Sequence, residues 1–141
     1  MGLDNGIILK TKTPIDLDTI PAYVNVEDMS MYYKDENVYA YECCYWRNCW
    51  TTRNEIINTC PNARDCEEGE SELNKKDVQI VQDILVNYLK NPESWDEGRS
   101  IWDFDEMAGV LSQQVINLGW LLQYMSDKAN QHWIVEFYDS Y

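Results

Sequence analysis

The sequence predicts an α+β fold, in which a small antiparallel sheet packs against three helices and one of these helices is central. Apolar residues recur at helical spacing over 75–90 and 104–126, and a third stretch with this spacing runs over 43–60. Segments that favour strands stand near both ends of the chain, at 6–11 and 132–138. Strands and helices mixed in this order are typical of an antiparallel sheet with helices packed on it.

The N-terminal part is predicted to begin with a strand and to continue without regular structure. Asn5 and Gly6 form a turn pair, and the residues after them favour a strand over 6–11. Residues 13–35 have no steady period and contain two prolines, so we expect an irregular acidic segment. Residues 37–42 alternate weakly, which fits either a strand or the lead-in to a helix.

Residues 43–60 predict the first long helix. Its stripe at helical spacing consists of Trp46, Cys49, Trp50, Arg53, Ile57 and Cys60. We expect Trp46, Trp50 and Ile57 to pack against the helix over 104–126, and the cysteines to behave as small buried hydrophobic residues.

The middle of the chain predicts a loop, a short strand and an amphipathic helix. Residues 62–70 are polar, and 70–73 favour a short strand. The helix over 75–90 has Asn74 as its N-cap and Asp77 in its first turn. Its buried face is predicted to carry Val78, Val81, Leu85 and Tyr88.

The helix over 104–126 is predicted to be the central one, because it is apolar over much of its circumference. Asp103 and Glu106 are spaced as a capping box at its start. Its main stripe is predicted to be Phe104, Met107, Leu111, Val115, Leu118, Leu122 and Met125. A last strand over 132–138 completes the predicted fold.

Length and charge limit the possible functions. At 141 residues the chain is about the size of one domain, so we expect a single globular domain over 1–141. The net charge of −14 disfavours direct binding to nucleic acid or to an anionic membrane and permits binding to a basic protein surface. There is no run of 18 apolar residues and no secretory signal, which favours a cytoplasmic location. No metal motif or cofactor motif is present, and we expect neither a metal nor a cofactor.

The first candidate site is a set of aromatic and cationic side chains on the helix predicted over 43–60. It comprises Trp46, Arg47, Trp50, Arg53 and Asn54. Aromatic faces beside guanidinium groups suit a nucleotide base and its phosphate. A buried unpaired guanidinium is very costly, so Arg53 must pair with a carboxylate, meet an anionic ligand or reach water. The tryptophans could equally be core residues while Arg53 pairs with an internal acid, and both interpretations stay open.

The second candidate site is acidic. The acids group in two stretches that we predict to be loops, and the candidates are Glu67, Glu68, Glu70, Glu72, Glu93, Asp96, Glu97 and Asp105. Carboxylates grouped in this way can stand in for phosphates on a basic nucleic-acid channel and speed association with it.

Short motifs of the chain resemble a group of small uncharacterised proteins of phages and Firmicute-type bacteria. These proteins begin with MGLD and carry a YWRKxxxIRN-like helix, which YWRNCWTTRNEI (45–56) resembles. They continue with GE-x-x-L, matched by Gly69 to Leu73, and end on an aromatic strand, matched by 133–141. Asn48 stands where lysine is usual. The resemblance implies no activity, but it does imply a phage or prophage setting.

Taken together, these features favour a phage-encoded inhibitor of the anti-CRISPR or anti-restriction type. It would act in the cytoplasm of the bacterial host by binding a host or defence protein that has a basic surface, without binding nucleic acid or membrane. A nucleotide-binding sponge that uses the Trp/Arg set is the alternative, and a structural or accessory phage protein is a third. No catalytic motif supports an enzyme. The oligomeric state is left open.

Overall fold

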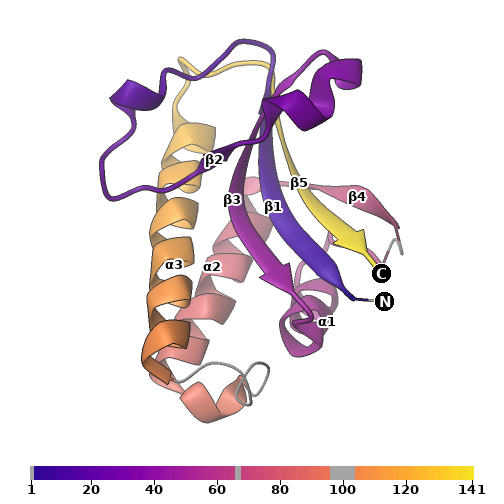
Figure 1. The fold of residues 1–141 in the computed structure, drawn as a ribbon, viewed down its shortest axis with the longest axis vertical. Coiled ribbons are helices and arrows are strands. Elements are labelled where there is room, and N and C mark those ends of the chain that lie inside the picture. The colour runs from indigo at the N-terminus through magenta and orange to yellow at the C-terminus, as the bar shows by residue number, and fades with distance from the viewer. Residues whose placement is uncertain (1, 66–67, 96–103) are drawn as a thin grey trace.

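A five-stranded antiparallel sheet, in the order β2-β3-β1-β5-β4, forms one layer of the molecule. The computed structural model describes residues 2–65, 68–95 and 104–141, except for the side chains of 68 and 104–107. The strands are β1 (Asp4–Thr11), β2 (Glu27–Asp28), β3 (Tyr39–Arg47), β4 (Glu68–Leu73) and β5 (Trp133–Ser140). The first and last strands pair with each other at the centre of the sheet, so both ends of the chain lie close together (Figure 1).

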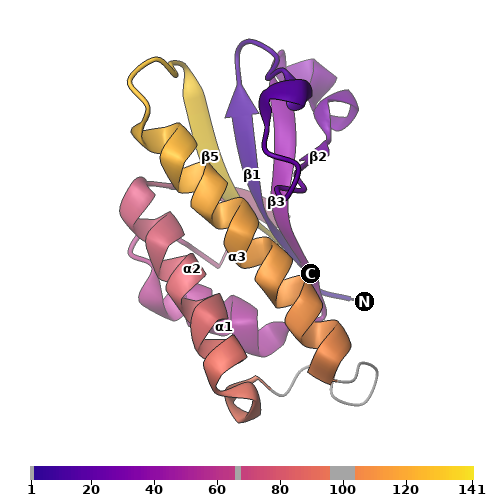
Figure 2. The same cartoon turned by 90° about the vertical axis from the view of Figure 1, so that its left-hand side faces the viewer.

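Three α-helices in the described part of the chain form the second layer, which confirms the predicted α+β class. They are α1 (Trp50–Thr59), α2 (Lys75–Lys90) and α3 (Phe104–Ser126). The two long helices pack on each other and lie together on one side of the sheet (Figure 2). Three short 3-10 helices also occur, namely η1 (Leu17–Thr19), η2 (Ser30–Glu36) and η3 (Pro92–Ser94). Two of them lie in the segment predicted to be irregular.

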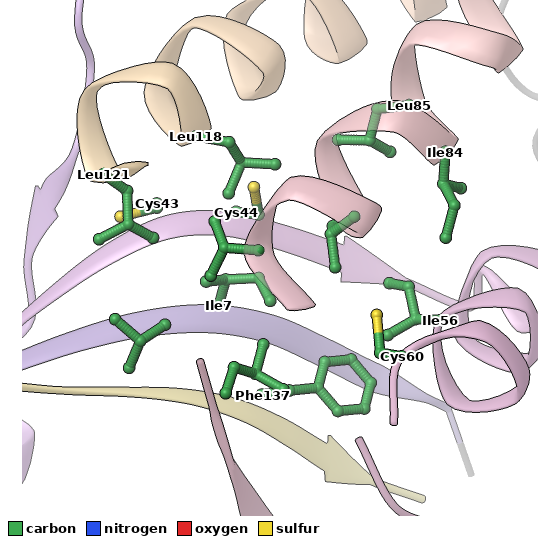
Figure 3. Close-up of a cluster of buried hydrophobic side chains, with 14 of the residues drawn as sticks. Ile7, Cys43, Cys44, Ile56, Cys60, Ile84, Leu85, Leu118, Leu121 and Phe137 are labelled. Atoms are coloured by element: carbon green, nitrogen blue, oxygen red, sulfur yellow. The ribbon is translucent and has the colours of Figure 1, made fainter. Parts of the chain in front are cut away.

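The core lies between the helices and the sheet, and every layer contributes to it. Figure 3 shows Ile7 and Phe137 from the central strands facing Leu85 of α2 and Leu118 of α3. Cys43, Cys44 and Cys60 are buried among these side chains, as predicted for small hydrophobic residues. Burial raises the pKa of the Cys60 thiol to about 12, so this cysteine stays a neutral thiol at physiological pH.

The prediction of one helix over 43–60 is wrong, because its first part is strand β3. Residues Tyr39–Arg47 pair along the whole of β1, and a bulge opposite the Ile7–Ile8 step adds one residue to β3. The bulge buries the neighbouring residues Cys43 and Cys44 together, which breaks the alternation expected of a strand. The predicted helical stripe arose because Trp46, a strand residue, stands at helical spacing from the residues of α1.

Asn48 makes the turn from β3 into α1. Its backbone is left-handed, with φ of 57°, a conformation that asparagine tolerates better than most residues. Its backbone N–H donates to the Leu3 carbonyl at 2.7 Å, and its side chain accepts from the Leu3 N–H at 2.9 Å. Asn48 therefore has a structural role at this turn.

The predicted packing of this region against the central helix is confirmed for Trp46 and wrong for Trp50. Trp46 is buried, and its indole N–H donates to Gln114 of α3 at 3.0 Å. Trp50 is 42% exposed, because α1 begins beyond the end of β3 and packs on α2 instead.

The helices over 75–90 and 104–126 are confirmed with the predicted bounds. Asn74 and Asp77 form a capping box at the start of α2, and the four residues predicted for its buried face are buried. On α3 the predicted stripe is confirmed for Leu111, Leu118 and Met125, which are buried. Val115 and Leu122 are only partly buried, and Leu121 is buried although it was not in the predicted stripe. The predicted capping box at Asp103 lies outside the described residues.

The predicted strands also need two corrections. β1 begins at Asp4, so Asn5 and Gly6 belong to the strand and do not form a turn. β4 begins at Glu68, so residues that were predicted to be a loop pair with β5 along the edge of the sheet.

Candidate functional site

Arg53, the central residue of the first candidate site, is held by an internal ion-pair cluster. Its Nε and one terminal nitrogen donate to the two carboxylate oxygens of Asp139 at 3.1 and 2.8 Å. The same terminal nitrogen lies 2.8 Å from Asp65, and the other donates to Asn54 at 2.9 Å. Trp50 and Tyr141 flank the guanidinium, whose central carbon lies 5.6 and 5.0 Å from their ring centres. The guanidinium is therefore directed at protein acceptors on each of its nitrogens.

The cluster ties helix α1 to the C-terminal strand β5. Asp139 is completely buried, and Asn5 of β1 donates to the same carboxylate at 2.8 Å. The hydrogen bonds that Arg53 donates to Asp139 outweigh the effect of burial and raise the pKa of Arg53, which stays charged. A bidentate pair with this geometry is among the stronger polar contacts in proteins. The cluster therefore has a structural role, which is to attach α1 to β5.

The five residues of the first candidate site do not line one pocket. Trp46 points into the core from β3, whereas Trp50, Arg53 and Asn54 lie on α1. Arg47 is exposed at the end of β3. Their apparent proximity depended on a continuous helix from 43 to 60.

The acidic candidates fall into two groups that the structure places on different elements. Glu70 and Glu72 are exposed on the edge strand β4, while Glu93 is exposed in η3, directly after α2. Glu68 opens β4 and Asp105 lies in the first turn of α3, but their side chains are outside the described residues. Glu67, Asp96 and Glu97 lie outside the described residues altogether.

The side of the sheet that faces away from α2 and α3 gathers acids from four strands. Directly paired residues of antiparallel strands place their side chains on the same face. The register joins Ile8 to Glu42 and Glu136, then Glu42 to Glu27 and Glu136 to Glu72. One row across this face therefore contains Glu27, Glu42, Ile8, Glu136 and Glu72. We call this side, with Glu70 in the next row, the acidic sheet face.

A pocket of about 550 Å³ is hollowed into the acidic sheet face. It lies between the edge strand β4 and the segment that contains η2. Its lining comprises Ile8, Met29, Tyr32, Tyr33, Glu42, Gly69, Glu70, Tyr138, Asp139 and Ser140. Among these lining residues none is a lysine or an arginine. We call it the tyrosine–glutamate pocket.

Tyr138 and Glu42 form the floor of this pocket. The Tyr138 hydroxyl donates to the Glu42 carboxylate at 3.2 Å. The Tyr138 ring lies across Gly6, where a Cβ would overlap with the ring and come within 2.7 Å of the Cys44 carbonyl. A residue without a side chain is therefore needed at Gly6 for the Tyr138 ring to lie over β1.

Burial perturbs the carboxylates of this face. It raises the pKa of Glu42, although the hydrogen bond from Tyr138 acts against the shift. It also raises the pKa of Glu136, against the effect of Lys10. Within the described part of the chain, neither Glu42 nor Glu70 has a lysine or arginine within ion-pair distance. Glu42 is thus a partly dehydrated anion and Glu70 an exposed one, and neither has an ion-pair partner in the described residues.

Sequence reasoning missed Glu42, Glu136 and Tyr138, because each lies in a strand whose opposite face is core. Their flanking residues are buried, as Val135 and Phe137 are beside Glu136. The alternation in WIVEFYDS was the available signal, since it places the acid and the tyrosine on the face opposite the valine and phenylalanine.

A second depression, of about 570 Å³, lies between α3 and the edge of β3, and its lining includes the hydrogen-bonded amides of Gln113, Gln114 and Asn117. Asn117 donates to the carbonyls of Asn25 and Cys43 and accepts from the Asn25 N–H. Gln114 donates to the Tyr45 carbonyl. These side chains fix the segment before β2 and the edge of β3 on α3, which is a structural role.

Comparisons with known proteins give no match: no family model, no curated protein and no solved structure is significantly similar to the chain. No described helix is long and apolar enough to cross a membrane. In the ranges that the structure describes, no three His, Cys, Asp or Glu side chains are grouped to hold a metal ion.

Proposed function

We propose that this protein binds another protein through the acidic sheet face and thereby inhibits a host or defence protein that handles nucleic acid. The observation that carries the proposal is the row of glutamates across four strands on the side of the sheet without α-helices. The anti-restriction or anti-CRISPR form of this activity, in the cytoplasm of a bacterial host, rests on the resemblance to phage proteins.

The acidic sheet face has the properties of a docking surface for a basic partner. Its carboxylates project from paired strands, whose hydrogen bonds fix the positions of the side chains better than a loop would. Along β4, Glu70 and Glu72 are two residues apart and thus roughly 6.8 Å from each other. A regular array of this kind presents anions at defined spacing to cationic side chains that ordinarily bind phosphates.

The charge of the chain supports the same proposal. With a net charge of −14, the protein attracts a basic surface over distances of about a Debye length, roughly 8 Å at physiological salt. Electrostatic attraction of this kind mainly speeds association, so binding should weaken steeply as salt is added.

The test is phage plating on bacterial strains that carry a restriction system or a CRISPR nuclease. Expression of the wild-type chain is expected to raise the plating efficiency on a defended strain and to leave it unchanged on the undefended parent. The variant E70K/E72K should lose this effect, because it reverses two charges on the acidic sheet face. A purified nuclease from the responding strain should bind the wild-type chain, and its association rate should fall as salt is raised.

The matched control is D83K/E93K, which reverses two exposed acids on α2 and η3, in the helical layer. It changes the net charge as much as E70K/E72K does but leaves the sheet face intact. Equal loss of plating in both variants would show that net charge alone matters. Unchanged plating with the wild-type chain on every defended strain would count against an inhibitor and favour an accessory phage protein.

A further inference from the structure

One cation is already bound on the acidic sheet face, and it belongs to the chain itself. The ammonium of Lys10 lies 2.8 Å from Glu36 and 3.1 Å from Glu136. It also lies 4.6 Å from the ring centre of Tyr33. Burial alone would lower the pKa of Lys10, but the hydrogen bonds to the two glutamates raise it overall. A tyrosine with two glutamates on this face therefore forms a stable binding site for a cation.

The tyrosine–glutamate pocket beside the Lys10 site also combines a tyrosine with two glutamates, but it contains no cation from the described residues. Tyr138 takes the place of Tyr33, and Glu42 and Glu70 take the places of the two glutamates. Tyr32, 71% exposed, stands at the pocket's rim and offers a second aromatic surface. The Glu42 carboxylate accepts a hydrogen bond from the Tyr138 hydroxyl, which offsets part of the cost of its burial. No lysine or arginine of the described residues forms an ion pair with it.

We propose that the tyrosine–glutamate pocket receives an arginine side chain from the partner protein. This inference rests on the proposed function and names the chemistry that the partner presents. The guanidinium would stack on the ring of Tyr138 and donate hydrogen bonds to Glu42 and Glu70.

Arginine fits this pocket better than lysine for two reasons. A planar guanidinium stacks on an aromatic ring and can donate in parallel to a carboxylate, whereas an ammonium is a compact and strongly hydrated point charge. The ring of Tyr138 lies over Gly6, where no side chain separates it from the strand, and this ring provides the surface for stacking. A volume of about 550 Å³ accommodates a whole arginine side chain together with part of its backbone.

The experiment is an amide-shift titration by NMR with three small probes at equal ionic strength. N-acetyl-arginine amide carries the guanidinium, N-acetyl-citrulline amide is its neutral isostere, and N-acetyl-lysine amide carries a charge of another shape. The arginine probe is expected to shift the amides of Gly69, Glu70 and Tyr138 in a saturable way. We expect a dissociation constant of about 1 to 10 mM, weaker binding of the lysine probe and no saturable shift with citrulline.

Variants locate the binding. E42Q keeps an acceptor for Tyr138 and removes one charge, and E70Q removes the other; each should weaken arginine binding about two- to five-fold. D83N on the outer face of α2 is the control and should not change it. The NMR spectra themselves report whether each variant is folded, and E70Q, on an exposed edge position, tests the proposal even if E42Q fails to fold.

Two results would overturn the pocket assignment. One is the absence of saturable shifts from the arginine probe up to about 50 mM, and the other is an equal response to citrulline. Neither result would affect the plating test, in which E70K/E72K disrupts the whole face. Conversely, specific arginine binding without any gain in plating would support the pocket and contradict the inhibitor function.

Discussion

Two cations of this protein are held in similar ways but have different surroundings. Arg53 lies between Trp50 and Tyr141 and pairs with two aspartates, and Lys10 lies over Tyr33 and pairs with two glutamates. The Arg53 cluster is closed, because its main partner, Asp139, is fully buried under α1. The Lys10 cluster stands beside an open pocket that repeats its aromatic and acidic groups.

The difference separates a cluster that serves stability from a pocket that we propose for recognition. The Arg53 guanidinium directs four of its five N–H groups at protein acceptors, so its contribution is to join elements. The carboxylates of Glu42 and Glu70 line a pocket and have no ion-pair partner in the described residues, so acceptors remain available on them. Arg53 and Lys10 are both buried, so burial of the cation does not distinguish the two clusters. They differ in whether the nearby carboxylates already have a cationic partner.

The largest effect is expected when the closed cluster loses its cation. R53M removes the guanidinium and leaves the buried carboxylate of Asp139 without its countercharge, which should lower the free energy of unfolding by about 3 to 5 kcal/mol. Urea denaturation followed by tryptophan fluorescence measures this loss.

D65N is the matched control for R53M, because it removes the partly exposed partner and keeps the buried pair. It should cost no more than about 1 kcal/mol. If R53M were as mild as D65N, the contrast between a closed structural cluster and an open one would fail. Arginine binding at the tyrosine–glutamate pocket should be unchanged in D65N.

The parts of the fold that local periodicity specifies were predictable. The bounds of α2 and α3 follow from their apolar spacing, and the N-cap at Asn74 follows from its capping box with Asp77. β3 was not predictable in the same way, because the bulge at Cys43 breaks the alternation of a strand and Trp46 stands at helical spacing from the residues of α1. Only pairing with β1, a contact distant in sequence, reveals it.

The sites depend still more on long-range pairing. Sequence reasoning left open whether Arg53 pairs internally, and the carboxylate that decides the question stands 86 residues away at Asp139. The tyrosine–glutamate pocket is assembled from β1, β3, β4, β5 and the segment before β3. No local pattern brings Glu42 next to Tyr138, so only Glu70, of the three residues that carry the pocket proposal, was named from the sequence.

A smaller effect is expected when the open cluster loses its shape. G6A places a methyl group against the Tyr138 ring and the Cys44 carbonyl, so the ring or the strand must move. Overpacking of this kind should cost about 1 to 3 kcal/mol and weaken arginine binding at the pocket. A thermal melt and the probe titration measure the two effects. A G6A variant with wild-type stability and binding would show that the ring is not fixed as described.

The smallest effect is expected from E42Q, and its sign is opposite. Burial raises the pKa of Glu42 above its ordinary value of 4.5, so the folded chain binds the proton more tightly than the unfolded chain. The charged form therefore costs native stability at neutral pH, and this cost disappears as the pH falls from the raised pKa to the ordinary one.

E42Q should be more stable than the wild-type chain at pH 7, by less than about 1 kcal/mol, and equally stable near pH 4. Parallel urea denaturation of both proteins across this range isolates Glu42 from the other acids. If E42Q is more stable than the wild-type chain yet binds arginine less well, the Glu42 carboxylate serves recognition at a cost in stability. If E42Q is less stable at pH 7, Glu42 has a structural role, as Arg53 does.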